Sequence, residues 1–325
     1  MTVNIKKRNI DDPLVTIAIP TYNRADAYLK DAIQSAINQT YPNLEIIISD
    51  NCSSDNTGLV VASFNDPRIQ YFRHDENIGA NNNFNFCLEK ATGVFFLLLH
   101  DDDLIDEDFV KICMDAVKNK VDIGIVRTGT RVIDSDGIVL NETPNMVGGL
   151  PTEDFIRVWF AWKTALYLCS TLFNTKRLEE IGGFQSRPYL FQDVFAELQL
   201  ASKYGRIDIQ DVKASFRQHP DEITFVSGIR NWCDDSLFLL DCICDLVPKD
   251  NTIIKKEGLS YFSRFNHELA CKIKSPLTRY IAYLTIIKAF KFVFLRDLFM
   301  RPLRRSVIYP PLRSIKRKII PSSNQ

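Results

Sequence analysis

The sequence predicts an α/β fold in which helices cover both faces of a mostly parallel β-sheet. Three short segments, 14–20, 44–49 and 94–99, are almost continuously apolar, as strands buried on both faces are. Segments with apolar residues at helical spacing separate them. Strands that alternate with helices indicate a parallel sheet, because the chain returns to the same edge through a crossover helix. A helical C-terminal extension is expected after this part.

The most regular pattern lies in the first 130 residues. The segment 14–20 ends at a proline, and an apolar stripe then runs from Tyr28 to Ile37 before the chain reaches Tyr41 and Pro42. The stretch from 50 to 58 is polar and predicts a loop. The complete pattern predicts strands at 14–20, 44–49, 69–72, 94–99 and 123–127, and helices at 28–37, 83–91 and 107–117.

The rest of the chain is less periodic until about residue 229, after which the pattern is mostly helical. Trp159, Trp162 and Tyr167 either form a platform for a ligand or belong to the core. We predict a sheet-containing domain over residues 1–225 and a helical region over residues 226–325. Between them, the expected elements are a hairpin at 132–139 around Asp136-Gly137, a helix at 153–162 with Thr152 as its N-cap, a tight loop at Gly182-Gly183-Phe184 and a helix at 192–203.

Composition excludes several classes of protein. The 325 residues include 40 basic and 40 acidic side chains, which argues against disorder and against a nucleic-acid partner. The eight cysteines form no CxxC pair, so free thiols of a reducing compartment are expected rather than a zinc site. Residues 1–13 lack the apolar core of a secretion signal, and the apolar stretch 280–287 is too short to span a bilayer. A cytoplasmic location is expected.

The C-terminal tail is strongly basic. Residues 275–325 contain eleven Lys or Arg side chains and one acidic residue, Asp297. Ile281, Leu284, Ile287 and Phe290 recur at helical spacing among these cations. A basic amphipathic helix can lie on an anionic membrane surface, so we expect peripheral association with the inner face of the cell membrane. The alternative is that the tail packs on the body or on a second copy.

Polar residues follow three of the predicted strands directly. Tyr22 to Arg24 follow the first strand, Asp50 ends the second, and three aspartates, 101–103, follow the strand at 94–99. In sheets of this kind ligands bind beyond the carboxyl ends of the strands, so these side chains should converge on one crevice. Asp50 could accept a hydrogen bond from a ligand there, or it could close a local turn.

Three consecutive aspartates repel one another and raise one another's pKa values. A divalent cation relieves this repulsion, and Mg²⁺ and Mn²⁺ prefer carboxylate and phosphate oxygens. The alternative is a solvated acidic turn that caps the following helix, which begins near Asp106 and Glu107.

Five motifs occur in order between Pro20 and Asp103, and together they resemble glycosyltransferase family 2, whose members have the GT-A fold. The resemblance continues to Gly182-Gly183-Phe184, to Gln192-Asp193 and to Arg217-Gln218-His219-Pro220, and covers about residues 13–225. The five motifs are Pro20-Thr21-Tyr22-Asn23-Arg24, the segment from Ile48 to Asp55, Asn77-Ile78-Gly79, Ala91-Thr92-Gly93 and Leu99-His100-Asp101-Asp102-Asp103.

The resemblance implies a role for each matching residue. Asp193 stands at the position of the general base. Arg217 and His219 resemble a pair that closes over the diphosphate of the donor. The metal ligands implied, for Mn²⁺ or Mg²⁺, are Asp102, Asp103 and His219, and the residues implied to bind the nucleotide-sugar are Pro20, Thr21, Tyr22, Asn23, Arg24, Asp50, Asn77, Gly79, Asn83, Asp101 and Arg217.

Two positions depart from the family pattern. His100 occupies the first position of the family's Asp-x-Asp motif if Asp102 is the third, whereas the alternative register pairs Asp101 with Asp103. We favour Asp102 as the ligand. Gln192 replaces the glutamate that precedes the base, which removes a charge that would raise the pKa of Asp193.

These features predict an inverting glycosyltransferase that moves a sugar from a nucleoside-diphosphate sugar to a hydroxyl. A cation stabilises the leaving diphosphate, a carboxylate takes the proton of the acceptor, and no covalent intermediate is required. The family and the basic tail together favour a lipid-linked glycan acceptor in the synthesis of O-antigen (lipopolysaccharide), capsule or exopolysaccharide. The alternatives are a sugar nucleotidyltransferase, which would normally carry a Gly-rich phosphate loop, and a non-catalytic nucleotide-sugar-binding protein.

Overall fold

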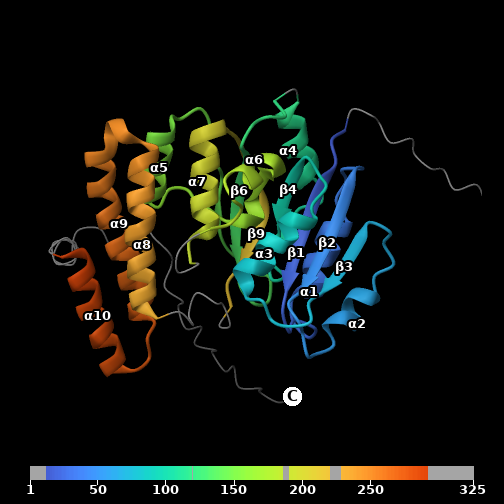
Figure 1. The fold of residues 1–325 in the computed structure, drawn as a ribbon, viewed down its shortest axis with the longest axis horizontal. Helices are drawn as coiled ribbons and strands as arrows, with labels where there is room; N and C mark the ends of the chain where they lie inside the picture. The colour runs from blue at the N-terminus through green and yellow to red at the C-terminus, as the bar shows by residue number, and fades with distance from the viewer. Residues whose placement is uncertain (1–11, 119, 186–189, 220–227, 292–325) are drawn as a thin grey trace, which may run out of the picture.

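The computed structural model describes residues 12–118, 120–185, 190–219 and 228–291 (Figure 1). The predicted boundary between residues 225 and 226 lies outside these ranges, as does most of the basic tail, which begins at Ser275.

A nine-stranded sheet crosses the described part of the chain in the order β3-β2-β1-β4-β8-β6-β9-β5, and β7 pairs with β6. β1 to β4 pair in parallel, β8 runs antiparallel between β4 and β6, and β9 is again parallel to β6. Most strands therefore point the same way, which confirms the predicted α/β class. The strands are β1 (Val15–Thr21), β2 (Leu44–Asp50), β3 (Ile69–Arg73), β4 (Phe95–Leu98), β5 (Leu104–Ile105), β6 (Ile125–Ile133), β7 (Val139–Thr143), β8 (Thr171–Asn174) and β9 (Arg206–Arg217).

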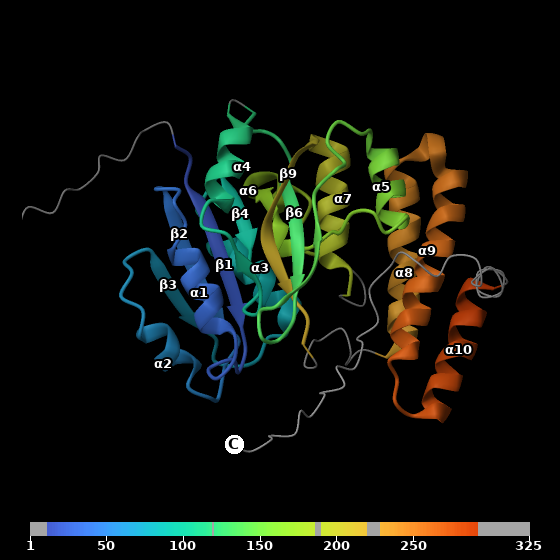
Figure 2. The same cartoon turned by 180° about the vertical axis from the view of Figure 1, so that it is seen from behind.

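Helices pack on both faces of the sheet: α3 lies in front of the strands in Figure 1, and α1 lies in front of them in Figure 2, the view from behind. The alternation of side chains along β1 separates the two cores, since Ile17 packs with α1 and α4 whereas Ala18 packs with α3. The helices are α1 (Leu29–Ile37), α2 (Thr57–Ala62), α3 (Ala80–Lys90), α4 (Phe109–Val117), α5 (Thr152–Phe160), α6 (Thr175–Glu180), α7 (Gln192–Tyr204), α8 (Ile229–Leu246), α9 (Asn251–Cys271) and α10 (Pro276–Phe290), with 3₁₀ turns at Leu168–Ser170 and Pro248–Asp250.

The C-terminal helices α8, α9 and α10 form a separate layer beside α5 and α7 (Figures 1 and 2). Their apolar side chains belong to the same core cluster as residues of α3 and α7. Trp159 on α5 is 5% exposed, and its ring centroid lies 4.8 Å from that of Tyr261 on α9. Trp159 is therefore a core residue and does not form an open platform.

Several elements differ from the sequence-based expectation. α2 occupies the end of the predicted polar loop and the residues that follow it, and α6, β5, β8 and β9 were not predicted. The helix α5 begins at Thr152 itself, so Pro151 is the cap position and no side chain caps the helix. The helix α3 begins three residues earlier than predicted, because Gly79 adopts a positive φ of 84° and turns the chain into it.

The cysteines are free thiols, as predicted, and most of them are buried. Within the described ranges the structure contains no helix that combines the length and the apolar character needed to cross a bilayer.

A buried ion cluster fastens α7 to the sheet. Arg127 on β6 is 1% exposed, and its Nε lies 3.2 Å from Glu197 Oε2 on α7. Its Nη1 lies 3.5 Å from Asp208 Oδ1 on β9, and Arg206 Nε lies 2.8 Å from Asp208 Oδ2. The ring of Phe155 packs against both guanidinium groups. Because these charges are removed from water, each depends on its partners.

Replacing Arg127 with methionine should lower the free energy of unfolding by about 3 to 5 kcal/mol, since Glu197 would remain buried without a cation. The matched control is Arg157→Met, because Arg157 also pairs with a glutamate, Glu257, at 3.0 Å but is half exposed. The control should cost less than about 1 kcal/mol. Urea unfolding measures both, and equal losses would contradict the role assigned to the buried cluster.

Candidate active site

The loops that follow β1, β2 and β4 lie at one edge of the sheet, because these strands are parallel neighbours. The end of β9 reaches the same place through its contacts with the loop after β4. The structure thus brings together most of the segments that the sequence singled out, including residues 20–24, 50–55, 100–103 and 217–219.

The end of β9 holds the acidic loop. The backbone N–H of Arg217 donates to Asp103 Oδ1 at 2.9 Å, and its Nε donates to the carbonyl of Asp102 at 2.8 Å. His219 Nε2 donates to Asp102 Oδ2 at 2.9 Å. The guanidinium of Arg217 also lies over the ring of Tyr28, 4.3 Å from its centroid. Arg217 therefore supports the loop, and its predicted contact with a diphosphate stays a prediction.

The three carboxylates have different electrostatic surroundings. Burial, with the charge of Asp102, raises the pKa of Asp101 to about 7, although Arg24 Nε lies 3.6 Å from Asp101 and opposes this. Burial and the charge of Asp102 also raise the pKa of Asp103 well above its usual value. Burial acts on Asp102 too, but the hydrogen bond from His219 and the electrostatic interactions with His100, His219 and Arg24 outweigh it and lower its pKa. Asp102 is thus the carboxylate that stays charged.

Three side chains of this loop could hold a cation. One ligand atom each from His100, Asp102 and Asp103 lies within 4.8 Å of the others. The Nε2 atom of His100 is buried and has no hydrogen-bond partner among the described residues. A buried nitrogen without a partner and two carboxylates make a donor set that fits a divalent cation. The predicted ligand His219 is bonded to Asp102 and lies outside this group of three.

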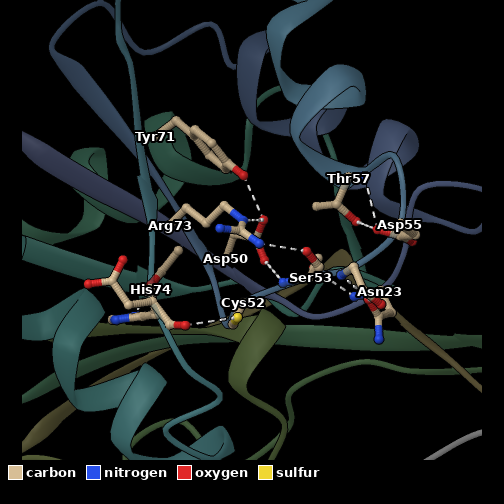
Figure 3. A network of polar contacts seen from close by, with 12 residues as sticks. Asn23, Asp50, Cys52, Ser53, Asp55, Thr57, Tyr71, Arg73 and His74 are labelled. Atoms are coloured by element: carbon tan, nitrogen blue, oxygen red, sulfur yellow. Dashed lines mark hydrogen bonds and ion pairs between the residues drawn. The ribbon is translucent and has the colours of Figure 1, made fainter.

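Hydrogen bonds connect the loop after β1 to the loop after β2 (Figure 3). Asn23 has a positive φ of 52°; its N–H donates to Ser53 Oγ at 2.8 Å, and its Oδ1 accepts from the N–H of Ser54. Asp55 Oδ2 accepts from the N–H of Ala25 at 2.9 Å, and Asp55 Oδ1 accepts from Thr57. These bonds shape the segment from Tyr22 to Arg24, in which the Tyr22 side chain is 46% exposed and open to a ligand.

Asp50 is buried, and its carboxylate is surrounded by its hydrogen-bond and ion-pair partners (Figure 3). Its side chain is 1% exposed, its Oδ1 accepts from the N–H of Ser53 at 2.8 Å, and its Oδ2 accepts from the Tyr71 hydroxyl at 2.6 Å. Arg73 Nε lies 3.9 Å from the same Oδ2. The local bond to Ser53 is the turn that the sequence left open as an alternative. Contact between Asp50 and a nucleotide base stays a prediction.

Asn77 and Asn83 also hold backbone. Asn77 Oδ1 accepts from the N–H of Gly79 at 2.9 Å and from the side chain of Asn51. Asn83 is 2% exposed, accepts from the Ser49 hydroxyl at 2.5 Å and donates to the Ser49 carbonyl at 3.0 Å. Asn83 therefore joins α3 to the end of β2. Gly79 shapes the loop through its positive φ.

Asp193 lies in the first turn of α7. Burial raises its pKa, and the N–H of Val194 and the electrostatic interaction with His100 oppose that rise. His100 acts electrostatically on Asp102 as well, so the candidate base and the acidic loop share this neighbour. A carboxylate with a raised pKa is suited to taking a proton.

The family model described as glycosyl transferase family 2 matches residues 16–182, which is more than half of the chain. The chain belongs to glycosyltransferase family 2. The match ends before α7, so it includes the acidic loop but not Asp193.

Two curated proteins are similar to part of this family 2 chain. An uncharacterized glycosyltransferase of Rickettsia felis is 34% identical over 199 residues, which cover 59% of this chain and 32% of that protein. A GalNAc(5)-diNAcBac-PP-undecaprenol beta-1,3-glucosyltransferase of Campylobacter jejuni is 30% identical over 176 residues, covering 52% of this chain and 55% of that protein. The aligned region thus spans only about a third of the length of the first relatives that it matches.

Solved structures share the fold of this family 2 chain. Residues 1–349 of S. aureus TarS, in complex with UDP-GlcNAc, superpose with a TM-score of 0.57 at 14% identity, covering 88% of this chain and 91% of that one. The mannosyltransferase PcManGT from Pyrobaculum calidifontis, in complex with GDP-Man and Mn²⁺, gives 0.54 at 18% identity, covering 88% and 84%. These similarities support the GT-A fold with its C-terminal helical layer.

Sequence reasoning did not assign a role to Asp235 on α8. Its side chain is fully buried, and its Oδ2 accepts from the N–H groups of Leu190 and Phe191, each at 3.0 Å. These amides lie immediately before α7, and the charge of Asp235 raises the pKa of Asp193. Only the fold brings Asp235 to this place, because its neighbours in sequence resemble any amphipathic helix. Asp235 therefore positions the segment that carries the candidate base.

Replacing Asp235 with asparagine should lower kcat for glycosyl transfer by about tenfold to a hundredfold, because small displacements of a catalytic group have effects of this size. The dissociation constant of the donor should change little, since the amides that Asp235 binds, those of Leu190 and Phe191, lie just before α7 and not in the loops after β1 and β2. Steady-state kinetics and calorimetric donor titration separate the two effects. Asp241→Asn, at an exposed position of the same helix, is the control and should leave kcat unchanged.

Proposed function

We propose that this chain is an inverting glycosyltransferase that moves a sugar from a nucleoside-diphosphate sugar to a hydroxyl of a glycan acceptor, with Mn²⁺ or Mg²⁺. The observation that carries the proposal is that Asp193 and Asp102 share a neighbour, since both interact electrostatically with His100. A proton acceptor and a cation-binding carboxylate at one sheet edge are the two groups that such a reaction needs.

The donor would lie across the loops after β1 and β2. The exposed ring of Tyr22 supplies a surface for the base, and Arg24 supplies a positive charge beside Asp101. Asp50, Asn77 and Gly79 fix the backbone on this side of the site through their hydrogen bonds and backbone conformation. The remaining residues assigned to the donor are Pro20, Thr21, Asn23, Asn83 and Arg217.

Asp102 and Asp103 are the carboxylates assigned to the cation, and His219 is assigned the role of orienting Asp102 through its hydrogen bond rather than that of a ligand. A bound cation would stabilise the negative charge that builds on the leaving diphosphate. The chain's own part is to hold Asp102 charged and in place.

Asp193 would take the proton of the acceptor hydroxyl. Its raised pKa makes it a better base than an exposed aspartate, because a base works best when its pKa approaches the operating pH. Direct attack by that hydroxyl on the opposite side of the anomeric carbon inverts its configuration. No second carboxylate is then needed as a nucleophile.

The name of one relative supports the acceptor that we propose. The Campylobacter jejuni relative is named for a glycan carried on undecaprenol diphosphate. A lipid-linked glycan of the kind used in O-antigen, capsule or exopolysaccharide synthesis is therefore the acceptor that we propose.

The described start of the tail supports contact with an anionic membrane at the inner, cytoplasmic face. One face of α10 leaves four apolar side chains exposed, Leu277 at 70%, Tyr280 at 60%, Ile281 at 54% and Leu284 at 48%. Their spacing places them on a single side of the helix. An apolar helix face followed by cations in the sequence has the character of an interfacial helix.

Replacing Asp193 with asparagine should reduce transfer by at least about a thousandfold, because the acceptor proton loses its base and the reaction loses a well-placed group. Binding of UDP-GlcNAc or GDP-Man, measured by calorimetry with Mn²⁺, should stay within about twofold of wild type, because the variant keeps the shape of the side chain. The control is Gln199→Glu, which changes the charge of the same helix by one unit at a different position. Loss of binding and transfer in equal measure would refute the assignment of Asp193 as the base.

Glutamates at Leu277 and Ile281 should lower the fraction of full-length protein that sediments with anionic vesicles by about tenfold or more, since two charges would have to enter the interface. The control is Leu59→Glu, because Leu59 on α2 is also 70% exposed. Equal vesicle binding by the wild type and the double variant would show that this face does not contact lipid.

A further inference from the structure

His100 is a residue of the acidic loop that the proposed function does not assign as a ligand of the cation. It lies two residues after the end of β4, and its ring packs against Phe84 of α3 with 5.3 Å between the centroids. Its Nε2 atom is buried and has no hydrogen-bond partner among the described residues. Leaving a buried polar atom without a partner costs about 1 to 3 kcal/mol, so such an atom at a site indicates a missing ligand.

The neighbours of His100 identify the kind of ligand. A ligand atom of His100 lies within 4.8 Å of those of Asp102 and Asp103. The other nearby histidine, His219, already donates from its Nε2 to Asp102. His100 thus supplies a nitrogen at a place where the rest of the donor set is oxygen.

We propose that His100 is a nitrogen ligand of the cation in this site and makes the site prefer Mn²⁺ to Mg²⁺. The inference deepens the proposed function and rests on it, because it assumes that a cation binds here together with a nucleoside diphosphate. Mg²⁺ takes oxygen ligands almost exclusively, whereas an imidazole binds transition metals more strongly.

The position of His100 in the loop gives this choice a physical reason. Asp101 and Asp103 are buried, and repulsion from Asp102 already acts on both. A fourth carboxylate at position 100 would add to that repulsion, whereas a neutral imidazole adds a ligand without adding negative charge. With histidine at position 100 the loop can bind a divalent cation, and it has less negative charge to stabilise when no cation is bound.

Pulsed electron paramagnetic resonance of Mn²⁺ tests the proposal directly. The full-length protein is loaded with Mn²⁺ and UDP, and in a second series with Mn²⁺ and GDP. Modulation from a coordinated ¹⁴N nucleus should appear in the wild type and should be replaced by a ¹⁵N signal when the protein is made with ¹⁵N-histidine. His100→Asp should lose the modulation, and competition titration should show its preference for Mn²⁺ over Mg²⁺ fall by about tenfold.

The control is His219→Gln, which should keep the nitrogen modulation because His219 is bonded to Asp102. His100→Gln keeps the bulk of the side chain and should also lose the signal, so a folding defect in His100→Asp does not decide the result. Modulation of wild-type depth in both His100 variants would overturn this inference and leave the proposed function standing. A wild type that binds no Mn²⁺ with either nucleotide would overturn this inference together with the cation part of the proposed function.

Discussion

The site depends on the hydrogen bonds between the end of β9 and the acidic loop, residues 100–103. Three consecutive aspartates repel one another, and two of them are also buried. The N–H and guanidinium of Arg217 and the ring of His219 supply the donors that offset this cost. Because β9 lies beside the loop through its pairing with both β6 and β5, the second half of the sheet helps to hold a loop of the first half.

The helix that carries Asp193 is held from two sides. Arg127 of β6 binds Glu197, one turn after Asp193, and Asp235 of α8 binds the amides just before the helix. The first contact fixes α7 against the sheet and the second fixes it against the C-terminal layer. The position of the candidate base is therefore set jointly by the two regions that the sequence divides at residue 225.

The sequence predicts the parallel first half of the fold well, because β1, β2 and β4 are buried on both faces and read as continuous apolar runs. It does not predict β9, whose residues are mostly half-buried and include Asp208, which pairs with Arg127 on β6 as well as with Arg206 on β9 itself. β5 and β8 are too short to leave a pattern of their own. The residues of a motif likewise do not reveal that the side chains of Asn83 and Asp50 are buried, since that depends on Ser49, Ser53 and Tyr71. The contact of His100 with Phe84 and those of Asp235 with Leu190 and Phe191 also join residues that are far apart in the sequence.

The shared core of α5, α7 and the C-terminal helices has a consequence for building chimeras. Helices α8 to α10 look like an appendage in Figure 1, and exchanging them between relatives would seem a simple way to redirect the enzyme to another acceptor. Yet α8 carries Asp235, and its Trp232 packs edge-on against Phe191 beside α7. A transplanted layer would have to bring its own equivalent of this acid and this aromatic contact. The helices are therefore not an interchangeable cassette, and natural exchange should favour junctions that keep them with α7.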